Sequence, residues 1–213
     1  DVPFGLPQIV AMYNMDTAEL TMRCGIRAMR NAPELLDEYQ SGASLVALAD
    51  KYKLTPLTIL RQFYDQREVP ITLTEAEIAE LHRIDGTSPQ HMDKIRKDAQ
   101  EYEDKLAVEM RKHGWKFKTE NEIRAEHTTG PLITPDYLMD KDSAPIVDGA
   151  PIYWIDAKNY PYYGSELVAK KLLKQSIKYN AAFGPGAFVF NGGIISTARR
   201  PPFDARALSM TFT

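Results

Sequence analysis

Two strand-like segments carry charged residues where a buried sheet would favour apolar ones. They are LITPDYLM, residues 132–139, and IYWIDAKNY, residues 152–160. Successive side chains of a strand point to opposite faces, so Trp154, Asp156 and Lys158 share one side of the second strand. Because burying an unpaired charge is costly, the fold must give this aspartate and this lysine a partner or a metal ion.

Asp136 opens the first strand, and the sequence favours a place for it beside Asp156. Asp148-Gly149, between the strands, suits a tight type I′ turn, but the prolines around it favour a longer irregular loop. Such a loop would let Asp136 reach Asp156. Two aspartates at a sheet edge form a hard oxygen site of the kind that Mg²⁺ or Mn²⁺ prefers. Lys158 would offset the charge of an anionic transition state; the alternative is an ordinary Asp–Lys pair on a solvated strand end.

A third carboxylate is expected from a long helix between residues 92 and 113. Its apolar stripe runs, at steps of three and four residues, through Met92, Ile95, Ala99, Tyr102, Leu106 and Met110. Glu103 flanks this stripe and is the better candidate for reaching a metal ion at the sheet edge. Glu101 points away from the stripe and is the rival, while an ordinary flank carboxylate is the alternative for Glu103.

A second helix is expected after Ser165, and Gly184-Pro185-Gly186 would end it. Gln175 interrupts its apolar row one turn before Tyr179, and a buried glutamine needs hydrogen-bond partners such as a water or a phosphate. The same helix has a basic face made of Lys170, Lys171, Lys174 and Lys178. This face would hold a phosphate backbone, or its members are ordinary solvated lysines.

The order of these segments predicts the fold class. Strands are expected at residues 115–118, 136–139, 152–157 and 187–195, with an edge strand from ALSMTF near residue 210. The order helix, three strands, helix, strand indicates an α/β layer in which helices flank a mixed sheet. We expect this domain to span residues 91–213.

Residues 1–90 are expected to form a helical domain, with the turn-rich segment 86–90 as the boundary. Helices at residues 45–52 and from Pro56 onward, separated by a short break, make a helix-turn-helix pattern. Arg61 would lie on the outer surface of the second helix and contact DNA. A plain helical hairpin that packs its apolar faces is the alternative.

Composition limits where a nucleic acid would bind and where the protein would work. The 213 residues carry a net charge of −3 with a pI near 5.9, so any nucleic-acid contact must come from a local patch. The single cysteine excludes an internal disulfide and favours a reducing compartment. No apolar run approaches the roughly 20 residues of a membrane span, and the start without Met indicates a trimmed chain. We expect an intracellular protein of the nucleus, the cytoplasm or both.

Several motifs together resemble a known superfamily. P-D, a loop and I-D-A-K, preceded by a helical glutamate and followed by QSIKY, resemble the PD-(D/E)xK nucleases with the Q-x-x-x-Y helix of their RecB-like branches. ITPDYLM, DGAPIYWIDAKNY and QSIKYNAAFGPGAFVF are similar to the narrower TPD-motif family, whose animal member is the codanin-interacting nuclease. The resemblance covers roughly residues 95–213 and implies a restriction-endonuclease-like core.

The resemblance also implies a role for each candidate residue. The implied metal ligands are Asp136, Asp156, Glu103 and the backbone carbonyl of Ala157. Lys158 would orient the attacking water, and Gln175 and Tyr179 would position that water and the scissile phosphate. The implied cofactor is Mg²⁺ or Mn²⁺.

The resulting expectation is a metal-dependent nuclease that hydrolyses phosphodiester bonds with a metal-activated water. DNA is favoured over RNA, because the superfamily that the sequence resembles mostly cuts DNA. The alternative is an interaction or scaffold protein that keeps the nuclease fold and binds nucleic acid or a codanin-like partner with little or no catalysis. A DNA-binding regulator acting through the helix-turn-helix is a third reading.

Overall fold

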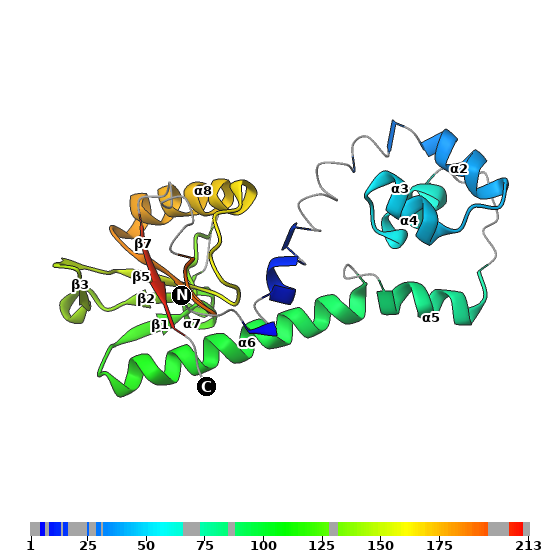
Figure 1. The fold of residues 1–213 in the computed structure, drawn as a ribbon. Coiled ribbons are helices and arrows are strands. Elements are labelled where there is room, and N and C mark those ends of the chain that lie inside the picture. Colours follow the sequence, from blue (N-terminus) through cyan, green and yellow to red (C-terminus); the bar gives the residue numbers. More distant parts are fainter. Residues whose placement is uncertain are drawn as a thin grey trace. The chain divides into compact units, whose positions relative to one another are not determined.

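The computed structural model, shown as a ribbon in Figure 1, describes most of the chain. The described residues are 5–6, 9–13, 15–16, 25, 29–30, 32–65, 73–84, 88–127, 132–195 and 205–210. The chain divides into a helical unit, residues 13–97, and an α/β unit, residues 1–12 with 98–213. The division falls a few residues beyond the predicted boundary at residues 90 and 91, which stays a prediction.

The helical unit contains the two helices of the predicted helix-turn-helix pattern. Its helices are α2 (Ala32–Gln40), α3 (Leu45–Tyr52), α4 (Pro56–Asp65) and α5 (Glu75–Ile84). Lys53 ends α3 in a left-handed conformation, with φ of 56°, and Pro56 opens α4 where its missing N–H costs nothing. At the start of α5, the Thr74 N–H donates to Glu77 Oε2 at 2.8 Å and the Glu77 N–H donates to Thr74 Oγ1 at 3.3 Å, forming a capping box. The sequence also predicts a helix capped by Asp16 or Thr17, from the helical spacing of Leu20, Cys24 and Met29, but most of that segment lies outside the described residues.

The long helix α6 (Pro89–Lys112) packs its C-terminal half against the sheet. Tyr102, Leu106 and Met110 are buried, as the apolar stripe predicted. At the other end Met92 and Ile95 are 39% and 47% exposed, so the predicted buried stripe is wrong there. The reason is that the core cluster shared with the sheet takes only residues from the C-terminal half of α6.

The predicted mixed α/β sheet is confirmed. Its strands are β1 (Phe117–Thr119), β2 (Tyr137–Met139), β5 (Trp154–Lys158), β6 (Ala187–Phe190) and β7 (Arg206–Ser209). They lie in the order β1-β2-β5-β6-β7, and β7 is the edge strand expected from ALSMTF. The pairs β1–β2 and β2–β5 are antiparallel, whereas β5–β6 and β6–β7 are parallel.

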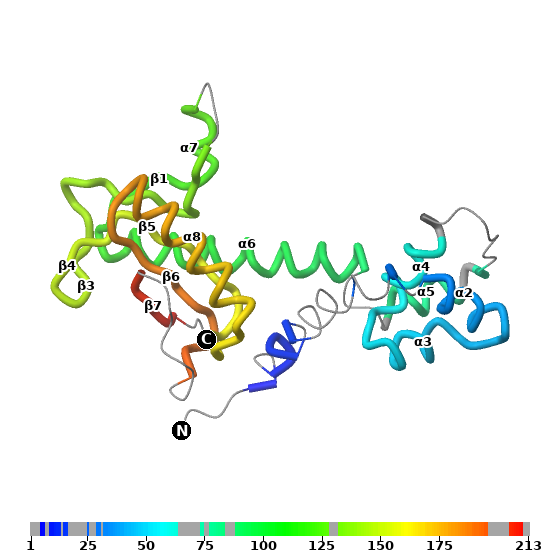
Figure 2. The backbone as a smooth tube through the Cα atoms, turned by 90° about the horizontal axis from the view of Figure 1, so that it is seen from above, coloured from blue at the N-terminus to red at the C-terminus, as the bar shows by residue number. Residues whose placement is uncertain are grey.

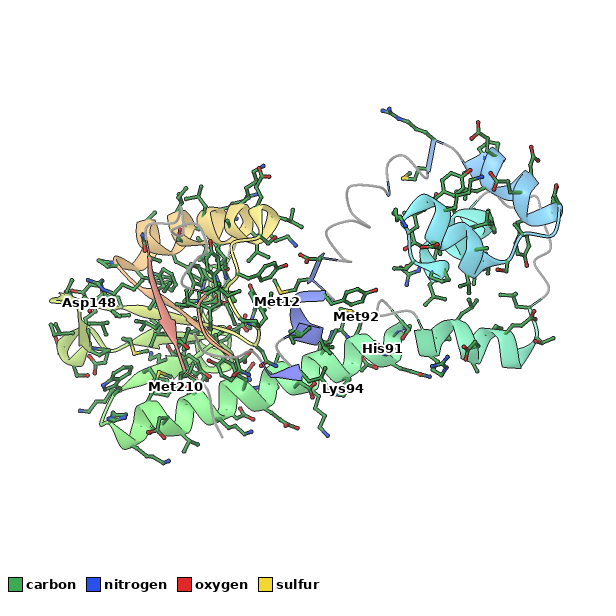
Figure 3. The ribbon with its side chains drawn as sticks, viewed as in Figure 1. Met12, His91, Met92, Lys94, Asp148 and Met210 are labelled. Carbon is green, nitrogen blue, oxygen red and sulfur yellow. The ribbon has the colours of Figure 1, made fainter. Side chains whose placement is uncertain are left out.

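Helices cover both faces of this sheet, as Figures 1 and 2 show. One apolar cluster joins α6 to Ile155 and Val189, and another joins α8 (Glu166–Phe183) to Trp154 and Phe188. The alternation of side chains along β5 therefore sends Trp154 toward α8 and Ile155 toward α6. Beyond β7 lies Met210, which Figure 3 labels. Its backbone oxygen accepts a hydrogen bond of 3.0 Å from the Tyr102 hydroxyl of α6.

Two features between the strands were not predicted. Helix α7 (Glu120–Glu126) begins directly after β1, and a small hairpin is formed by β3 (Ile146–Val147) and β4 (Ala150–Pro151), with a 3₁₀ turn at Lys141–Ser143 before it. Asp148 and Gly149 have φ of 50° and 77° at the hairpin tip, where Figure 3 labels Asp148, as a type I′ turn requires. The expectation of an irregular loop was wrong here. The tight turn forms within its own two-stranded sheet, so it leaves the register of β2 against β5 unaffected.

Among the described helices, none combines the length and the apolar character that crossing a membrane would need.

Candidate active site

The strand register brings Asp136 and Asp156 together. Tyr137 of β2 pairs with Ile155 of β5 in an antiparallel ladder, so the residue before Tyr137 lies beside the residue after Ile155. The backbone N–H of Ala157 donates to Asp136 Oδ2 at 2.6 Å and holds this carboxylate against β5.

Asp156 is buried, and polar side chains surround its carboxylate. Lys158 Nζ forms an ion pair with Asp156 Oδ1, and Gln175 Nε2 donates to Asp156 Oδ2 at 2.6 Å. Lys158 Nζ also donates to Gln175 Oε1 at 3.3 Å. The amide of Gln175 therefore bridges the carboxylate and the ammonium, which are otherwise costly to bury.

Tyr179 joins this network from one helical turn further along α8. Its hydroxyl accepts from Gln175 Nε2 at 3.0 Å and donates to the backbone oxygen of Thr134 at 2.8 Å, with Asp156 Oδ2 at 3.2 Å. Thr134 is the first residue of the T-P-D segment, and its hydroxyl donates to Glu120 Oε1 at 2.8 Å. These bonds tie α7, the lead into β2 and α8 to one site.

Burial and like charges dominate the electrostatics of the site. Burial, with the nearby charges of Asp156 and Glu103, raises the pKa of Asp136 to about 8. Burial and the charges of Asp156 and Glu120 also raise the pKa of Glu103. For Lys158, burial is the largest effect and would lower the pKa, but the charges of Asp156, Tyr160 and Asp136, together with the hydrogen bond to Asp156, outweigh burial and raise the pKa. The carboxylates thus repel one another, and Lys158 offsets only part of that repulsion.

The oxygen ligands of the site fit a hard divalent cation, although they are few. Within the described ranges no group of three or more His, Cys, Asp or Glu side chains is placed to hold a metal ion. The buried Asp156 and the half-buried Asp136 nevertheless offer oxygen ligands whose mutual repulsion a cation would relieve. Glu103 is half-buried and raises the pKa of Asp136, whereas the rival Glu101 is exposed. The backbone carbonyl of Ala157 stays a predicted ligand.

Two grooves open beside these residues. We call the first, of about 460 Å³, the cationic groove; it is lined by Glu120, Arg124, Leu132, Ile133, Thr134, Lys171, Lys174, Gln175, Lys178 and Tyr179. We call the second, of about 310 Å³, the acidic groove; it is lined by Gln100, Glu103, Asp104, Ala107, Val108, Arg111, Thr119, Glu120, Asn121, Asp136 and Tyr137. Three of the four predicted lysines thus line a groove beside the site, whereas Lys170 pairs with Glu166 at 2.7 Å.

Arg61 belongs to the helical unit and is exposed on α4, as predicted. The positions around it on α4 are mainly buried, namely Leu57, Ile59, Leu60 and Phe63. Within the described part of α4, few polar side chains are therefore available to contact a nucleic acid.

Three residues near the site were missed by sequence reasoning: Glu120, Thr134 and Tyr160. Burial raises the pKa of Tyr160, and the charges of Lys158 and Asp156 also act on this pKa. The hydroxyl of Tyr160 therefore lies near these two side chains. A signal for α7 existed in the capping box of Thr119 and Glu122. Thr134 belongs to the T-P-D segment that the sequence analysis singled out, but that motif gave it no role, and no local pattern marks Tyr160.

Comparisons with known proteins identify relatives of unknown function. The pattern of a family described as "Protein of unknown function TPD sequence-motif" matches residues 72–209. An uncharacterized protein of Acanthamoeba polyphaga mimivirus is 45% identical over 94 residues, which are 43% of this chain and 34% of the viral protein. The match thus spans about a third of that relative's length. No solved structure is significantly similar to this chain.

Proposed function

This chain belongs to the TPD sequence-motif family, whose function is unknown, and from the site we propose that it is a divalent-metal-dependent nuclease. The proposed reaction is hydrolysis of a phosphodiester bond, in DNA rather than RNA. The element order α6-β1-β2-β5-α8-β6 supports a PD-(D/E)xK core, the superfamily whose motifs the sequence resembles.

The observation that carries the proposal is the arrangement of Asp136, Asp156 and Lys158 at adjacent strand positions. Lys158 pairs with Asp156, and Asp136 lies beside them, immediately before β2. A protein that only needed a stable sheet would place apolar residues at such sites, because replacing buried ion pairs by apolar residues is often neutral or stabilising. Retention of three charges together with Gln175 and Tyr179 therefore supports a chemical role.

Each residue of the network has a proposed task. Asp136 and Asp156, with Glu103 and the Ala157 carbonyl, would hold the cation. The cation, when bound, would lower the pKa of a water and stabilise the leaving oxygen. Lys158 would orient the attacking water and offset negative charge on the phosphate as it develops. Gln175, already bonded to Asp156 and Lys158, would keep both in register with the phosphate.

The test is cleavage of labelled single-stranded, duplex and splayed DNA, and of single-stranded RNA, in Mg²⁺, Mn²⁺ or EDTA. We expect cutting of DNA with either metal and none in EDTA. Asp156→Asn should cut at least about a hundredfold more slowly, since losing a group that acts only in the transition state lowers the rate by such factors. Asp142→Asn is the matched control, because Asp142 is an exposed aspartate outside both grooves.

Cutting in EDTA, or at the wild-type rate in Asp156→Asn, would contradict the proposal. No cutting at all, with strand binding intact, would favour the interaction protein instead. A codanin-like partner would then be the first candidate to test.

A further inference from the structure

The two grooves beside the candidate site have opposite charge. The cationic groove contains one arginine and three lysines against one glutamate, Glu120, which also lines the acidic groove. The acidic groove contains four carboxylates, those of Glu103, Asp104, Glu120 and Asp136, against one arginine, Arg111. In a chain of net charge −3, a local positive field and a local negative field therefore lie in two neighbouring grooves that share Glu120.

The lysines of the cationic groove are available to a ligand. Lys171, Lys174 and Lys178 form no ion pair with any residue in the described part of the chain. Their spacing of three and four residues places them on one face of α8, over about 10 Å of helix. That length corresponds to about three phosphates of a stacked strand. Gln175 lies on the same face and connects this row to Asp156.

The acidic groove is unsuited to a phosphate backbone. Its arginine, Arg111, lies over the ring of Phe117 at 5.0 Å, which directs its charge toward the ring face. Beyond a cation held by Asp136 and Glu103, a strand that continued into this groove would meet the like charge of Asp104. Like-charge juxtaposition of this kind suppresses binding.

We propose that the protein holds a nucleic-acid strand on one side of the scissile phosphate only. The backbone phosphates of that strand lie in the cationic groove, on Lys171, Lys174 and Lys178, and the strand does not cross the acidic groove. This inference rests on the proposed nuclease function, because it takes the Asp136–Asp156 site as the point of cleavage. It predicts that the protein contacts the backbone phosphates on only one side of the cleaved bond.

The test measures, by fluorescence anisotropy, how tightly a labelled single-stranded DNA oligonucleotide binds to the full chain in EDTA. Each phosphate contact on a single strand contributes about 0.7 to the slope of log K against log salt. At 0.1 M salt, Lys174→Ala should therefore weaken binding about fivefold, and replacing all three lysines should weaken it about a hundredfold. Lys105→Ala is the matched control, since Lys105 is an exposed lysine outside both grooves, and should stay within about twofold.

Arg111→Ala tests whether the grip is one-sided. If the strand stays out of the acidic groove, this variant also remains within about twofold of the wild type. A fivefold loss in Arg111→Ala would overturn the inference, because the strand would then cross both grooves. Equal losses in Lys105→Ala and Lys174→Ala would overturn it as well, because binding would follow overall charge.

The outcomes separate this inference from the nuclease proposal. Unchanged binding in Lys174→Ala overturns the inference even if the wild type cleaves DNA. Loss of binding confined to the groove lysines supports it even if no cleavage is seen, and then the nuclease proposal alone fails. If polyglutamate displaces the oligonucleotide at a concentration equal to that of the oligonucleotide, the inference that the cationic groove binds nucleic acid is wrong.

Discussion

Replacing Gly186 with alanine would place a methyl group where the indole of Trp154 lies. A Cβ at residue 186 would be 2.1, 2.2 and 2.4 Å from three ring atoms of Trp154, whereas carbon atoms in ordinary contact lie about 3.5–4.0 Å apart. The indole would have to move by about 1.5 Å to restore that contact. This close approach explains why the F-G-P-G segment carries its second glycine.

Trp154 has little freedom to move. It is fully buried, and its Nε1 donates to the Gly184 carbonyl at 2.9 Å and lies 3.2 Å from Asn180 Oδ1. The rings of Tyr179 and Phe188 lie edge-on to it at 5.0 and 5.2 Å. Overpacking of a core costs about 1–3 kcal/mol, and a lost hydrogen bond about 1 kcal/mol more. We therefore expect Gly186→Ala to lower the free energy of unfolding by about 2–4 kcal/mol.

Urea unfolding followed by tryptophan fluorescence measures this loss. Both tryptophans, Trp115 and Trp154, belong to the α/β unit, so the signal reports on that unit. Gly114→Ala is the control, because a Cβ there meets nothing within 4 Å, although its φ of 78° costs about 1–2 kcal/mol. A loss in Gly186→Ala no larger than in the control would refute the packing argument. Displacement of Trp154 should also disturb Tyr179, and through it the candidate site.

Two further predictions concern the network around the aspartates. Thr134→Val removes the hydroxyl that donates to Glu120, so we expect urea unfolding to show a loss of about 1 kcal/mol in the stability of the α/β unit. Thr134→Ser keeps a hydroxyl and should restore most of this stability. If Thr134→Val shows no loss of stability, the hydrogen bond to Glu120 does not stabilise the unit. In EDTA, the stability of the wild type should fall as pH rises from about 4 through 8, because the folded state keeps the Asp136 proton up to a pKa of about 8 while the unfolded state releases it near the ordinary 3.8. Asp136→Asn should flatten this fall, and an unchanged pH profile in that variant would show that another group causes it.

The residues of the site were largely predictable because local periodicities placed them. Alternation along a strand put Asp156 and Lys158 on one face, and helical spacing put Tyr179 one turn after Gln175; the structure joins these four side chains by the hydrogen bonds and ion pair described. The chain between Asp136 and Asp156 was harder to predict. The type I′ turn and the prolines pointed to different connections, and the structure accommodates both by forming a separate hairpin.

The features that the sequence analysis missed are those without an apolar periodicity. No residue of α7 is buried, so that helix lacks the apolar stripe that identifies most helices, and its first residue, Glu120, was not predicted to belong to the site. The role of Thr134 depends on long-range bonds to α7 and α8. The apolar stripe of α6 led to the opposite error, because it predicted burial where there is none. The stripe continues through Met92 and Ile95, but both side chains are exposed and lie outside the core cluster shared with the sheet.

The most direct test of the central claim separates metal binding from cleavage at Lys158. Lys158→Met keeps the length of the side chain but removes the charge that pairs with Asp156, and Lys105→Met serves as the control. Calorimetry would measure Mn²⁺ binding, and single-turnover kinetics would measure DNA cleavage. We predict that the Mn²⁺ affinity of Lys158→Met stays within about threefold of the wild-type affinity. Its cleavage should be at least about a hundredfold slower. Cleavage by Lys158→Met at the wild-type rate would contradict the account, because the hydrolytic centre would then lie elsewhere.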